Sequence, residues 1–466
     1  MKFFSLLLFS LNITFPAIAS SISSIDDLKA EQVILRPIWR AKSTPNDYFS
    51  SNNYQEIKNY TNIEQVYYIP NDVKEHRNGP VYRLYDGYKH MDSLYQAEAS
   101  YTSEGILGYA WTSIAPAGST EMYRVYNASN GDHAIASPGA PLAGFTKSEF
   151  FHNHHAYPRY ASSTNTIECI NGVAVKLCSN KRAGGTVWSL SWNGMNFVNV
   201  LDYGRQIQSS LGQISNYGSL PTEGGDNANA HLNPVYWHGS PVSLFETINK
   251  TQKTRAIPLE WNFSFFGGNE HRPIIYPNWR LGKDVYLDSQ DLNLGTNFSY
   301  LIPQIVIYDT IAEFPKQLGN QSWQPSIEIP TGYVNNGPGN LNRFFTIDAS
   351  IENLNAALTE IGTSHFSEPE IGTFHYQSDV QAGGVVIAND HLSHAIGIYS
   401  KRIQNNFPDE NGYVYFTLWK FGSTNKWSAA YKGILNEGEN KFRTYILVGT
   451  LDDVRVMMRQ LFVMGY

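Results

Sequence analysis

Two polar segments in the second half of the chain carry side chains suited to acid–base chemistry. The first, residues 202–208, reads Asp-Tyr-Gly-Arg-Gln-Ile-Gln and directly follows an apolar stretch. Alternation along a strand places Tyr203 and Arg205 on one face and Gln208 on the other, and we expect Tyr203 and Gln208 to contact a ligand. Arg205 could hold a sugar carboxylate through two parallel hydrogen bonds, or it could form a structural ion pair with an acid such as Asp202.

The second segment, residues 221–226, reads Pro-Thr-Glu-Gly-Gly-Asp and places a carboxylate beside glycines. Glycine lets the backbone approach a ligand closely, so Glu223 is the first candidate for a general base or an acceptor of a sugar hydroxyl. The alternative is a polar turn that is stabilised by its own side chains. Both interpretations stay open at this point.

Two further pairs of residues contain histidines that could act as acids or ligand contacts. Trp237 and His238 could form a sugar subsite, with the indole stacked on the sugar, or they could pack in a core. His391 and His394 lie three residues apart in a predicted turn, where both could reach one ligand or could simply be surface polar residues. We take His238 and His394 as candidate catalytic acids, and Trp237 and His391 as candidate binding residues.

These residues are compatible with two sugar chemistries. In an epimerase-like reaction, Glu223 would accept a hydroxyl proton while His238 or His394 protonates the ring oxygen. In a lyase, Arg205 would neutralise a uronate, and a tyrosine or histidine would remove the α-proton. The alternative is a protein that binds a glycan without catalysis. No phosphate-binding loop, dinucleotide motif or nucleophile elbow indicates a cofactor, so none is expected.

Strands must position most of these side chains. Turn signals rich in glycine and asparagine separate short apolar or alternating segments, of which the clearest cover residues 171–177, 186–192, 197–201, 301–308, 384–388, 395–399 and 413–420. One helix is predicted over residues 451–461, with Thr450 as its N-cap and Asp453 three residues further on. The pattern predicts an all-β protein with a large antiparallel β-sandwich and a short C-terminal helix.

One stretch of this region has a recognisable pattern. A glycine pair at residues 184–185 precedes an alternating strand, a turn at residues 193–194 and a second strand that ends in Asp-Tyr-Gly-Arg at residue 205. This stretch resembles the opening of the galactose-mutarotase-like super-sandwich. The resemblance implies a β-sandwich domain over residues 161–466, of the kind that serves sugar epimerases, several polysaccharide lyases and domains of glycoside hydrolases. It implies a fold more than a reaction.

The N-terminal part contains a threefold internal repeat. Residues 37–40, 80–83 and 121–124 read Pro-Ile-Trp-Arg, Pro-Val-Tyr-Arg and Glu-Met-Tyr-Arg, and an aromatic residue followed by threonine recurs from residues 60, 101 and 145. His90 and His133 follow the arginine in copies two and three, where copy one has Tyr48. Because no helical periodicity appears, we expect a β-trefoil-like domain over residues 30–160, with His90 and His133 in contact with a glycan.

These repeats resemble the histidine- and tyrosine-rich repeats of many secreted bacterial proteins, which often accompany carbohydrate-active enzymes. Export is also indicated by the first residues, where Lys2, an apolar run over residues 3–15 and Ala-Ile-Ala at residues 17–19 have the form of a signal peptide over residues 1–19. We therefore expect a secreted or periplasmic protein. No other stretch is long and apolar enough to predict a membrane span.

Composition narrows the expected partners and sites. The formal charge is −7 and lysine and arginine form no run, which argues against nucleic acid, whereas 14% aromatic residues fit a glycan partner. The histidines of residues 152–155 have no further ligand at a fixed spacing, so we expect a hydrogen-bonded cluster and no metal. Cys169 and Cys178 flank an Asn-Gly hairpin turn that would hold them about 13 Å apart, so we favour free thiols.

Overall fold

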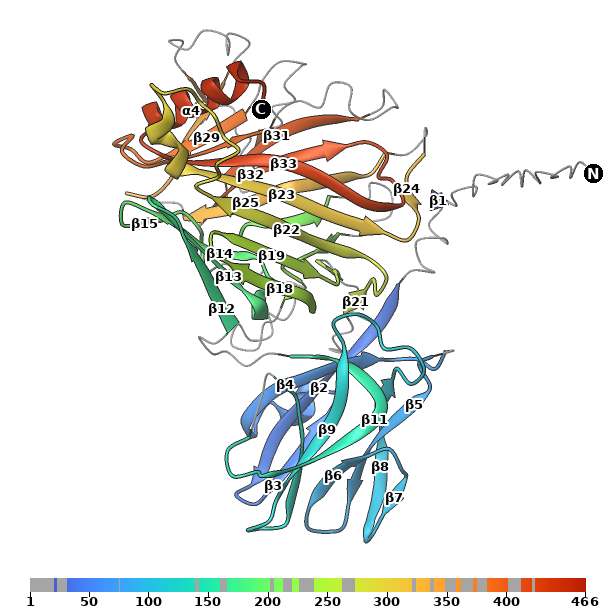
Figure 1. Cartoon of the computed structure of the whole chain (residues 1–466). Coiled ribbons are helices and arrows are strands. Elements are labelled where there is room, and N and C mark those ends of the chain that lie inside the picture. The colour runs from blue at the N-terminus through green and yellow to red at the C-terminus, as the bar shows by residue number, and fades with distance from the viewer. Residues whose placement is uncertain are drawn as a thin grey trace, which may run out of the picture.

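The computed structural model describes residues 21–22, 32–74, 76–138, 142–159, 166–201, 205–212, 220–225, 239–261, 273–320, 324–335, 339–347, 358–361, 372–374, 384–400, 412–420 and 424–466. The described chain is all-β with antiparallel sheets and a short C-terminal helix, as predicted. Figure 1 shows a smaller N-terminal part below a larger β-sandwich. Among the described residues, no helix has the length and hydrophobicity of a membrane span.

The N-terminal part consists of three units that share one strand order. In each unit, the strand with the marker arginine pairs on one side with a short returning strand and on the other with a second long strand. The elements are β2 (Val33–Thr44), β3 (Asp47–Ser51), α2 (Tyr54–Ile57) and β4 (Thr61–Pro70), then β5 (Gly79–Tyr85), β6 (His90–Ser93), β7 (Ala97–Glu98) and β8 (Tyr101–Ala110), then β9 (Thr120–Asn127), β10 (Asp132–Ala136) and β11 (Lys147–Pro158).

The three marker arginines tie these units into a ring. Each donates through Nη1 to a backbone carbonyl of another unit, at 2.8 to 3.1 Å: Arg40 to Ile135, Arg83 to Ser50 and Arg124 to Asp92. The three acceptors are equivalent, because each lies opposite the marker arginine of its own unit. Each arginine also forms an ion pair with a glutamate on the second long strand of its unit, namely Glu64, Glu104 and Glu149. The repeated arginine therefore serves the assembly of the units.

The larger part packs two antiparallel sheets face to face (Figure 1). In the first, the described strands run from β2 through β21 (Ile274–Ile275), β20 (Leu259–Glu260), β17 (Pro221–Thr222), β16 (Gln208–Leu211), β25 (Ser326–Asn335), β32 (Thr424–Lys432) and β31 (Tyr413–Lys420) to β28 (Gly372–Phe374). In the second, they are β18 (Val242–Ile248), β19 (Thr251–Ala256), β22 (Arg280–Leu287), β23 (Ile305–Phe314), β33 (Gly438–Gly449), β30 (Ala395–Tyr399), β29 (Gly384–Ala388), β26 (Arg343–Thr346) and β27 (Thr359–Ile361). Buried side chains from both sheets, such as Phe416, Trp427 and Val285, form the core between them.

Helix α4 (Leu451–Val463) packs its apolar side on the opposite face of the second sheet. Its N-terminus is the predicted capping box, in which Thr450 and Asp453 each accept a backbone N–H of the other. The prediction of a strand over residues 301–308 was half wrong, because the 3₁₀ helix η5 (Ser299–Gln304) precedes β23. The remaining described elements are β1 (Ser21–Ile22), β12 (Ile167–Asn171), β13 (Val175–Asn180), η2 (Lys181–Ala183), β14 (Val187–Trp192), β15 (Met195–Asn196) and β24 (Gln317–Leu318).

A predicted strand over residues 197–201 is also absent from the described structure. The chain forms only the two-residue strand β15 after the turn, and the Phe197 N–H then donates to the Leu190 carbonyl. The Asn196 side chain accepts the N–H groups of Leu190 and Val198, so a local side chain replaces part of the ladder. This stretch is irregular, with Phe197 and Val198 buried in the core.

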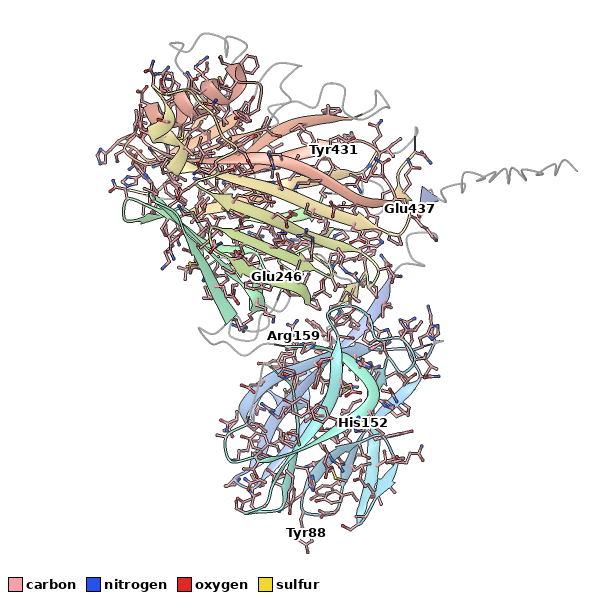
Figure 2. The ribbon with its side chains drawn as sticks, in the orientation of Figure 1. Tyr88, His152, Arg159, Glu246, Tyr431 and Glu437 are labelled. Carbon is pink, nitrogen blue, oxygen red and sulfur yellow. A yellow bond between two sulfur atoms is a disulfide. The ribbon has the colours of Figure 1, made fainter. Side chains whose placement is uncertain are left out.

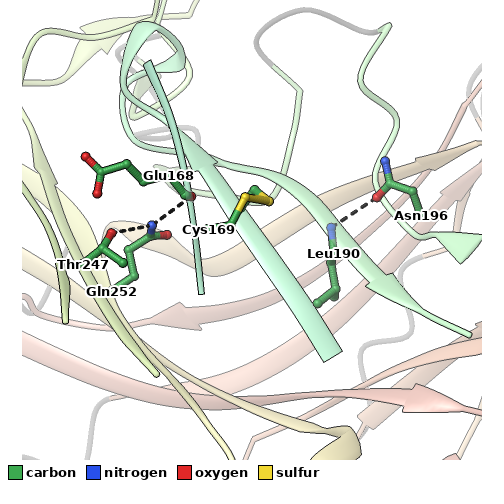
Figure 3. Close-up of a disulfide and its surroundings, with 7 residues drawn as sticks. Glu168, Cys169, Leu190, Asn196, Thr247 and Gln252 are labelled. Carbon is green, nitrogen blue, oxygen red and sulfur yellow. Dashed lines mark hydrogen bonds between the residues drawn. A yellow bond between two sulfur atoms is a disulfide. The ribbon is translucent and has the colours of Figure 1, made fainter. Parts of the chain in front are cut away.

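The preference for free thiols was wrong: Cys169 and Cys178 form a disulfide between β12 and β13 (Figure 3). The two cysteines are direct cross-strand partners, because Asn171 pairs with Lys176 and the turn lies further along the chain than the Asn-Gly signal suggested. The Asp288 carboxylate accepts the Val173 N–H at 2.8 Å and holds this longer turn. A contact from a distant segment has thus overridden the local turn preference.

The two parts of the chain share strand β2. Its first residues, Val33 and Ile34, pair with β21 of the sandwich, whereas its remaining length pairs within the repeat part. An apolar cluster with members from both parts, including Leu35, Trp111 and Ile257, fills the junction. The repeat part is therefore joined to the sandwich by a continuous strand and a buried contact.

Candidate functional site

The outward face of the first sheet carries aromatic and polar side chains over β25, β32 and β31. In β31, Phe416 and Leu418 belong to the core. Side chains alternate along a strand, so Tyr415 and Trp419, which flank this pair, lie on the opposite face. The same alternation in β32 turns Trp427 inward and Lys426 outward. Strand pairing places Tyr333, Lys426 and Trp419 in one row across the three strands.

Two cations alternate with three rings along this row. The Arg205 guanidinium lies 5.5 Å from the Trp261 ring centroid and 5.7 Å from that of Tyr333. The Lys426 ammonium lies 5.5 Å from the Tyr333 ring and 4.2 Å from that of Trp419. We call Trp261, Arg205, Tyr333, Lys426 and Trp419 the ring–cation row. Each cation is attracted by the electron-rich faces of its two neighbouring rings, which holds it in place.

Glu328 fixes the position of Lys426. Its Oε1 lies 2.6 Å from the Lys426 Nζ and accepts the Ser428 hydroxyl at 2.8 Å. Burial acts to lower the pKa of Lys426, but Glu328 and Tyr333 together outweigh it, so the pKa is raised and the ammonium stays protonated. The Lys426 ammonium also donates a hydrogen bond to the Tyr333 hydroxyl oxygen. Lys426 thus lies on β32, paired with Glu328 and with its side chain 14% exposed, whereas the half-buried Arg205 precedes β16.

Sequence reasoning found Arg205 but missed the other members of the row. Arg205 is half-buried and shares the row with Tyr333, which lies more than a hundred residues away in the chain. The missed signal was the alternation in residues 413–420, which places Tyr413, Tyr415 and Trp419 on one face of the strand. Aromatic residues on the face away from the core are the feature that could have identified this surface.

The other two described candidates of this region are held in structural contacts. Gln208 is 3% exposed, and its Oε1 accepts the Thr222 hydroxyl at 3.0 Å and the Gly224 N–H at 2.5 Å. Glu223 is fully buried between the two sheets, where its Oε1 lies 3.3 Å from the Lys283 Nζ and its Oε2 accepts the Ser209 N–H. A general base must reach its substrate, so this geometry favours a structural role for Glu223.

The close approach of the glycine pair explains why Glu223 is buried. Gly184 has a φ of +72°, and a Cβ at this position would lie 1.8 Å from the Glu223 carbonyl oxygen. Lys283 also donates to the Gly185 carbonyl and to the Thr254 hydroxyl. The glycines thus let the loop cover the ion pair, whereas the sequence suggested that glycines beside Glu223 would open it to a ligand.

The candidate histidines of the sandwich lie at another edge or outside the described residues. His391 is exposed in the turn between β29 and β30. His394 lies in the same turn, where its Nδ1 is hydrogen-bonded to the Ser393 hydroxyl at 3.1 Å. Its ring centroid lies 5.5 Å from that of Trp192, at the β14–β15 turn. Tyr203, Trp237 and His238 lie outside the described residues, so their predicted roles stay predictions.

His90 and His133 occupy equivalent positions between units of the repeat part. His90 lies opposite Tyr85 and His133 opposite Tyr126, and Tyr48 holds the same place in the first unit. The His90 Nδ1 lies 2.9 Å from Asp47 of the first unit, and its ring centroid lies 4.6 Å from that of Tyr85.

The His133 ring lies 4.8 Å from Tyr126 and 6.2 Å from Tyr101 of the second unit. Burial lowers the pKa of His133, and the Arg124 charge adds to this effect. Both histidines therefore pack units together, and their predicted contact with a glycan stays a prediction. Within the described ranges, no group of three His, Cys, Asp or Glu side chains could hold a metal ion.

Comparison with known proteins finds no matching family and no matching curated sequence. Solved structures do match. A candidate aldose 1-epimerase from Escherichia coli K12 is 10% identical, with 61% of this chain and 99% of that chain covered, at a TM-score of 0.35. A galactose mutarotase-like protein from Lactobacillus casei is 12% identical, with coverages of 60% and 99%, at a TM-score of 0.32.

A third match is the GH36 α-galactosidase AgaB from Geobacillus stearothermophilus, at 7% identity, with 62% of this chain and 40% of that chain covered and a TM-score of 0.31. The matched structures thus include a galactose mutarotase-like protein, the architecture whose opening the sequence of residues 184–205 resembles. At these identities and TM-scores, the likeness assigns neither a reaction nor a substrate to this chain.

Proposed function

We propose that this protein is exported and binds an acidic glycan on the outward face of its first sheet. The ring–cation row carries this proposal. Flat rings stack on the apolar faces of sugar residues, and cations fixed between the rings pair with carboxylates or sulfates of the same chain. The alternation of Trp261, Tyr333 and Trp419 with Arg205 and Lys426 supplies both kinds of contact in one line.

A lyase acting on uronate-containing glycans is a second candidate. The specific support is Tyr333, whose hydroxyl oxygen accepts a hydrogen bond from the Lys426 ammonium and whose ring lies beside the Arg205 guanidinium. In such a lyase, Tyr333 would remove the proton next to a uronate carboxylate, while Arg205 pairs with that carboxylate. The proton passes from the sugar carbon to the Tyr333 oxygen, the electron pair left behind forms the double bond, and the C–O bond to the glycosidic oxygen breaks. The protonated Tyr333 then returns this proton to the departing oxygen, which leaves as a hydroxyl.

The proposal is tested by incubating the purified full chain with polygalacturonate, alginate and hyaluronan, and with neutral polysaccharides as a comparison. We expect retention by an acidic polymer, and a loss of about tenfold or more in Trp419→Ala, since truncating an aromatic ring that stacks on the ligand costs at least about 1.4 kcal/mol. Tyr413→Ala is the matched control, because Tyr413 is on the same face of β31 but three rows away. Equal binding by Trp419→Ala and the unchanged protein would refute the proposed surface.

The two candidate functions give different products. A lyase releases unsaturated fragments that absorb in the near ultraviolet, whereas a binding protein retains the polymer intact. Tyr333→Phe keeps the ring but removes the hydroxyl, so it should abolish fragment release and keep retention. Fragment release by Tyr333→Phe would exclude that residue as the base. Export is tested by sequencing the mature N-terminus, which we expect to begin at Ser20.

A further inference from the structure

The third unit of the repeat part departs from the other two at one point of its second long strand. In the first unit, residues 66 and 67 lie between Gln65, opposite Trp39, and Tyr68, opposite Pro37. The second unit has the same spacing, with residues 107 and 108 in the gap. In the third unit, residues 151–154 fill the gap between the partners of Tyr123 and Glu121. The third unit therefore contains two additional residues.

Burial identifies which two residues are additional. Val66, Leu107 and Phe151 are the equivalent core residues at the start of the gap, and Ile69, Ala110 and Ala156 are equivalent after it. His152 and Asn153 are left over as the insertion. The His152 side chain is 80% exposed, and Asn153 has a φ of +60°, a left-handed conformation that asparagine tolerates better than most residues. Two units fold without these residues, so the fold does not need them.

The residues that contact the insertion are also particular to the third unit. Glu121 stands where the other units have Pro37 and Pro80, and its Oε1 accepts the Asn153 N–H at 3.1 Å. Its Oε2 lies 3.8 Å from the His152 Nδ1. Phe150 stands where the others have Gln65 and Ile106, and its ring is stacked on the imidazole of His152 at 6.3 Å and 23°.

These departures meet at one place on the surface. The Phe150 side chain is 52% exposed, and the Tyr123 ring lies 5.3 Å from it at a tilt of 40°. The exposed Phe150 ring therefore lies beside His152 and Tyr123, with the Glu121 carboxylate near His152, on a bulge held by hydrogen bonds. Bulges often redirect side chains at functional positions. Figure 2 shows His152 on the flank of the repeat part.

We propose that Phe150, His152 and Glu121 form a binding site for a neutral sugar, separate from the ring–cation row. The exposed Phe150 ring offers an apolar surface for one face of a pyranose. The Glu121 carboxylate accepts hydroxyl hydrogen bonds, because each of its oxygens has lone-pair capacity beyond the contacts described above. The same negative charge disfavours an acidic sugar, which distinguishes this ligand from that of the sandwich.

The test uses the full chain and a panel of neutral polysaccharides consisting of cellulose, chitin, xylan, galactan and starch. Phe150→Ala removes the exposed ring. Deletion of residues 152–153 restores the spacing of the other two units, which makes it a variant that the repeat itself supports. Ile106→Ala is the matched control, because Ile106 occupies the equivalent position in the second unit and is 41% exposed. Trp419→Ala reports on the ring–cation row. Circular dichroism establishes that each variant is folded.

We expect retention by at least one neutral polysaccharide, reduced about tenfold or more by Phe150→Ala and by the deletion and unchanged by Ile106→Ala. If the deletion does not fold, Phe150→Ala decides. The proposal is overturned if no neutral polysaccharide is retained, if Phe150→Ala binds as the unchanged protein does, or if Trp419→Ala alone abolishes retention. A protein partner that depends on Phe150, without polysaccharide retention, would also overturn it. Binding of acidic polymers can fail or succeed independently of each result.

Discussion

The carboxyl group of Asp92 should make the repeat part less stable as the pH rises. Asp92 is 3% exposed, and its Oδ2 accepts the Ser50 hydroxyl at 2.7 Å across the ring of units. Burial raises its pKa from the ordinary 3.8 to about 6, against the lowering effect of Ser50 and of the charges of Arg83, His90 and Arg124. The Oδ1 has no hydrogen-bond partner among the described residues, which fits a group that favours its neutral form.

The sign and the size of the effect follow from this raised pKa. The folded state holds the proton more tightly than the unfolded chain, so the stabilisation is fully present below pH 3.8 and is lost as the pH rises through about 6. A rise from 3.8 to about 6 corresponds to about 3 kcal/mol in the free energy of unfolding. Asp92→Asn keeps an acceptor for Ser50 but carries no titrating proton, so this loss disappears.

Hydrogen exchange on peptides from residues 33–158 measures the stability of the repeat part within the full chain. We expect Asp92→Asn to gain about 3 kcal/mol relative to the unchanged protein between about pH 4 and about pH 8. Comparing the two proteins at each pH removes the contribution of Asp132, whose pKa burial raises to about 7. Asp452→Asn, at an exposed position of α4, is the control. A difference between Asp92→Asn and the unchanged protein that stays constant with pH would refute the reasoning.

Three further changes test the structural contacts. Glu223→Gln leaves the Lys283 ammonium buried without its charged partner, so we expect a loss of about 3 to 5 kcal/mol in urea unfolding, and undiminished stability would contradict the buried ion pair. Replacing both cysteines with serine should destabilise the hairpin of β12 and β13 by about 3 kcal/mol, because the disulfide no longer restricts a short loop of the unfolded chain. Thiol titration of the unfolded, unreduced protein should find no free thiol. Arg40→Met removes the donor to the Ile135 carbonyl inside the ring of units. Hydrogen exchange in β10 should therefore become faster, while exchange in β30 of the sandwich stays unchanged. Exchange in β10 that is equal in the variant and the unchanged protein would show that the ring does not stabilise the repeat.

The all-β class and the C-terminal helix were predictable because local patterns specify them. Alternation in residues 413–420 and the apolar runs at residues 384–388 and 395–399 became β31, β29 and β30 with the predicted bounds. The capping residues Thr450 and Asp453 fixed the start of α4. These signals depend on neighbours in the sequence and not on distant contacts.

The errors arose where distant segments decide the local structure. The Asp288 carboxylate accepts a backbone N–H of the turn after Asn171, and in this turn Cys169 lies opposite Cys178. The Asn-Gly pair alone favours a tighter turn. Lys283, sixty residues away, draws Glu223 into the core, which no local pattern indicates. Buried ion pairs of this kind join residues by tertiary packing and leave no periodic signal.

The candidate site could be predicted only in part for the same reason. Arg205 was identified from its position after an apolar stretch, but Tyr333, Lys426 and Trp419 come from three strands whose register is set by pairing. The repeat markers were correctly located in the sequence, yet the arginines bind backbone carbonyls of neighbouring units. The departures of the third unit, Glu121 and the insertion of His152 and Asn153, became informative only once the strand pairing had aligned the units.

The most direct test of the proposed function is calorimetric titration of the full chain with an acidic oligosaccharide and with the same oligosaccharide after reduction of its carboxyl groups. The acidic oligosaccharide is one that the polymer panel identifies. We predict that the acidic form binds, that the reduced form binds about tenfold or more weakly, and that Trp419→Ala weakens the acidic form to a similar extent. Equal affinity for the two forms, or an affinity that Trp419→Ala leaves unchanged, would contradict the assignment of the ring–cation row as the site of an acidic glycan.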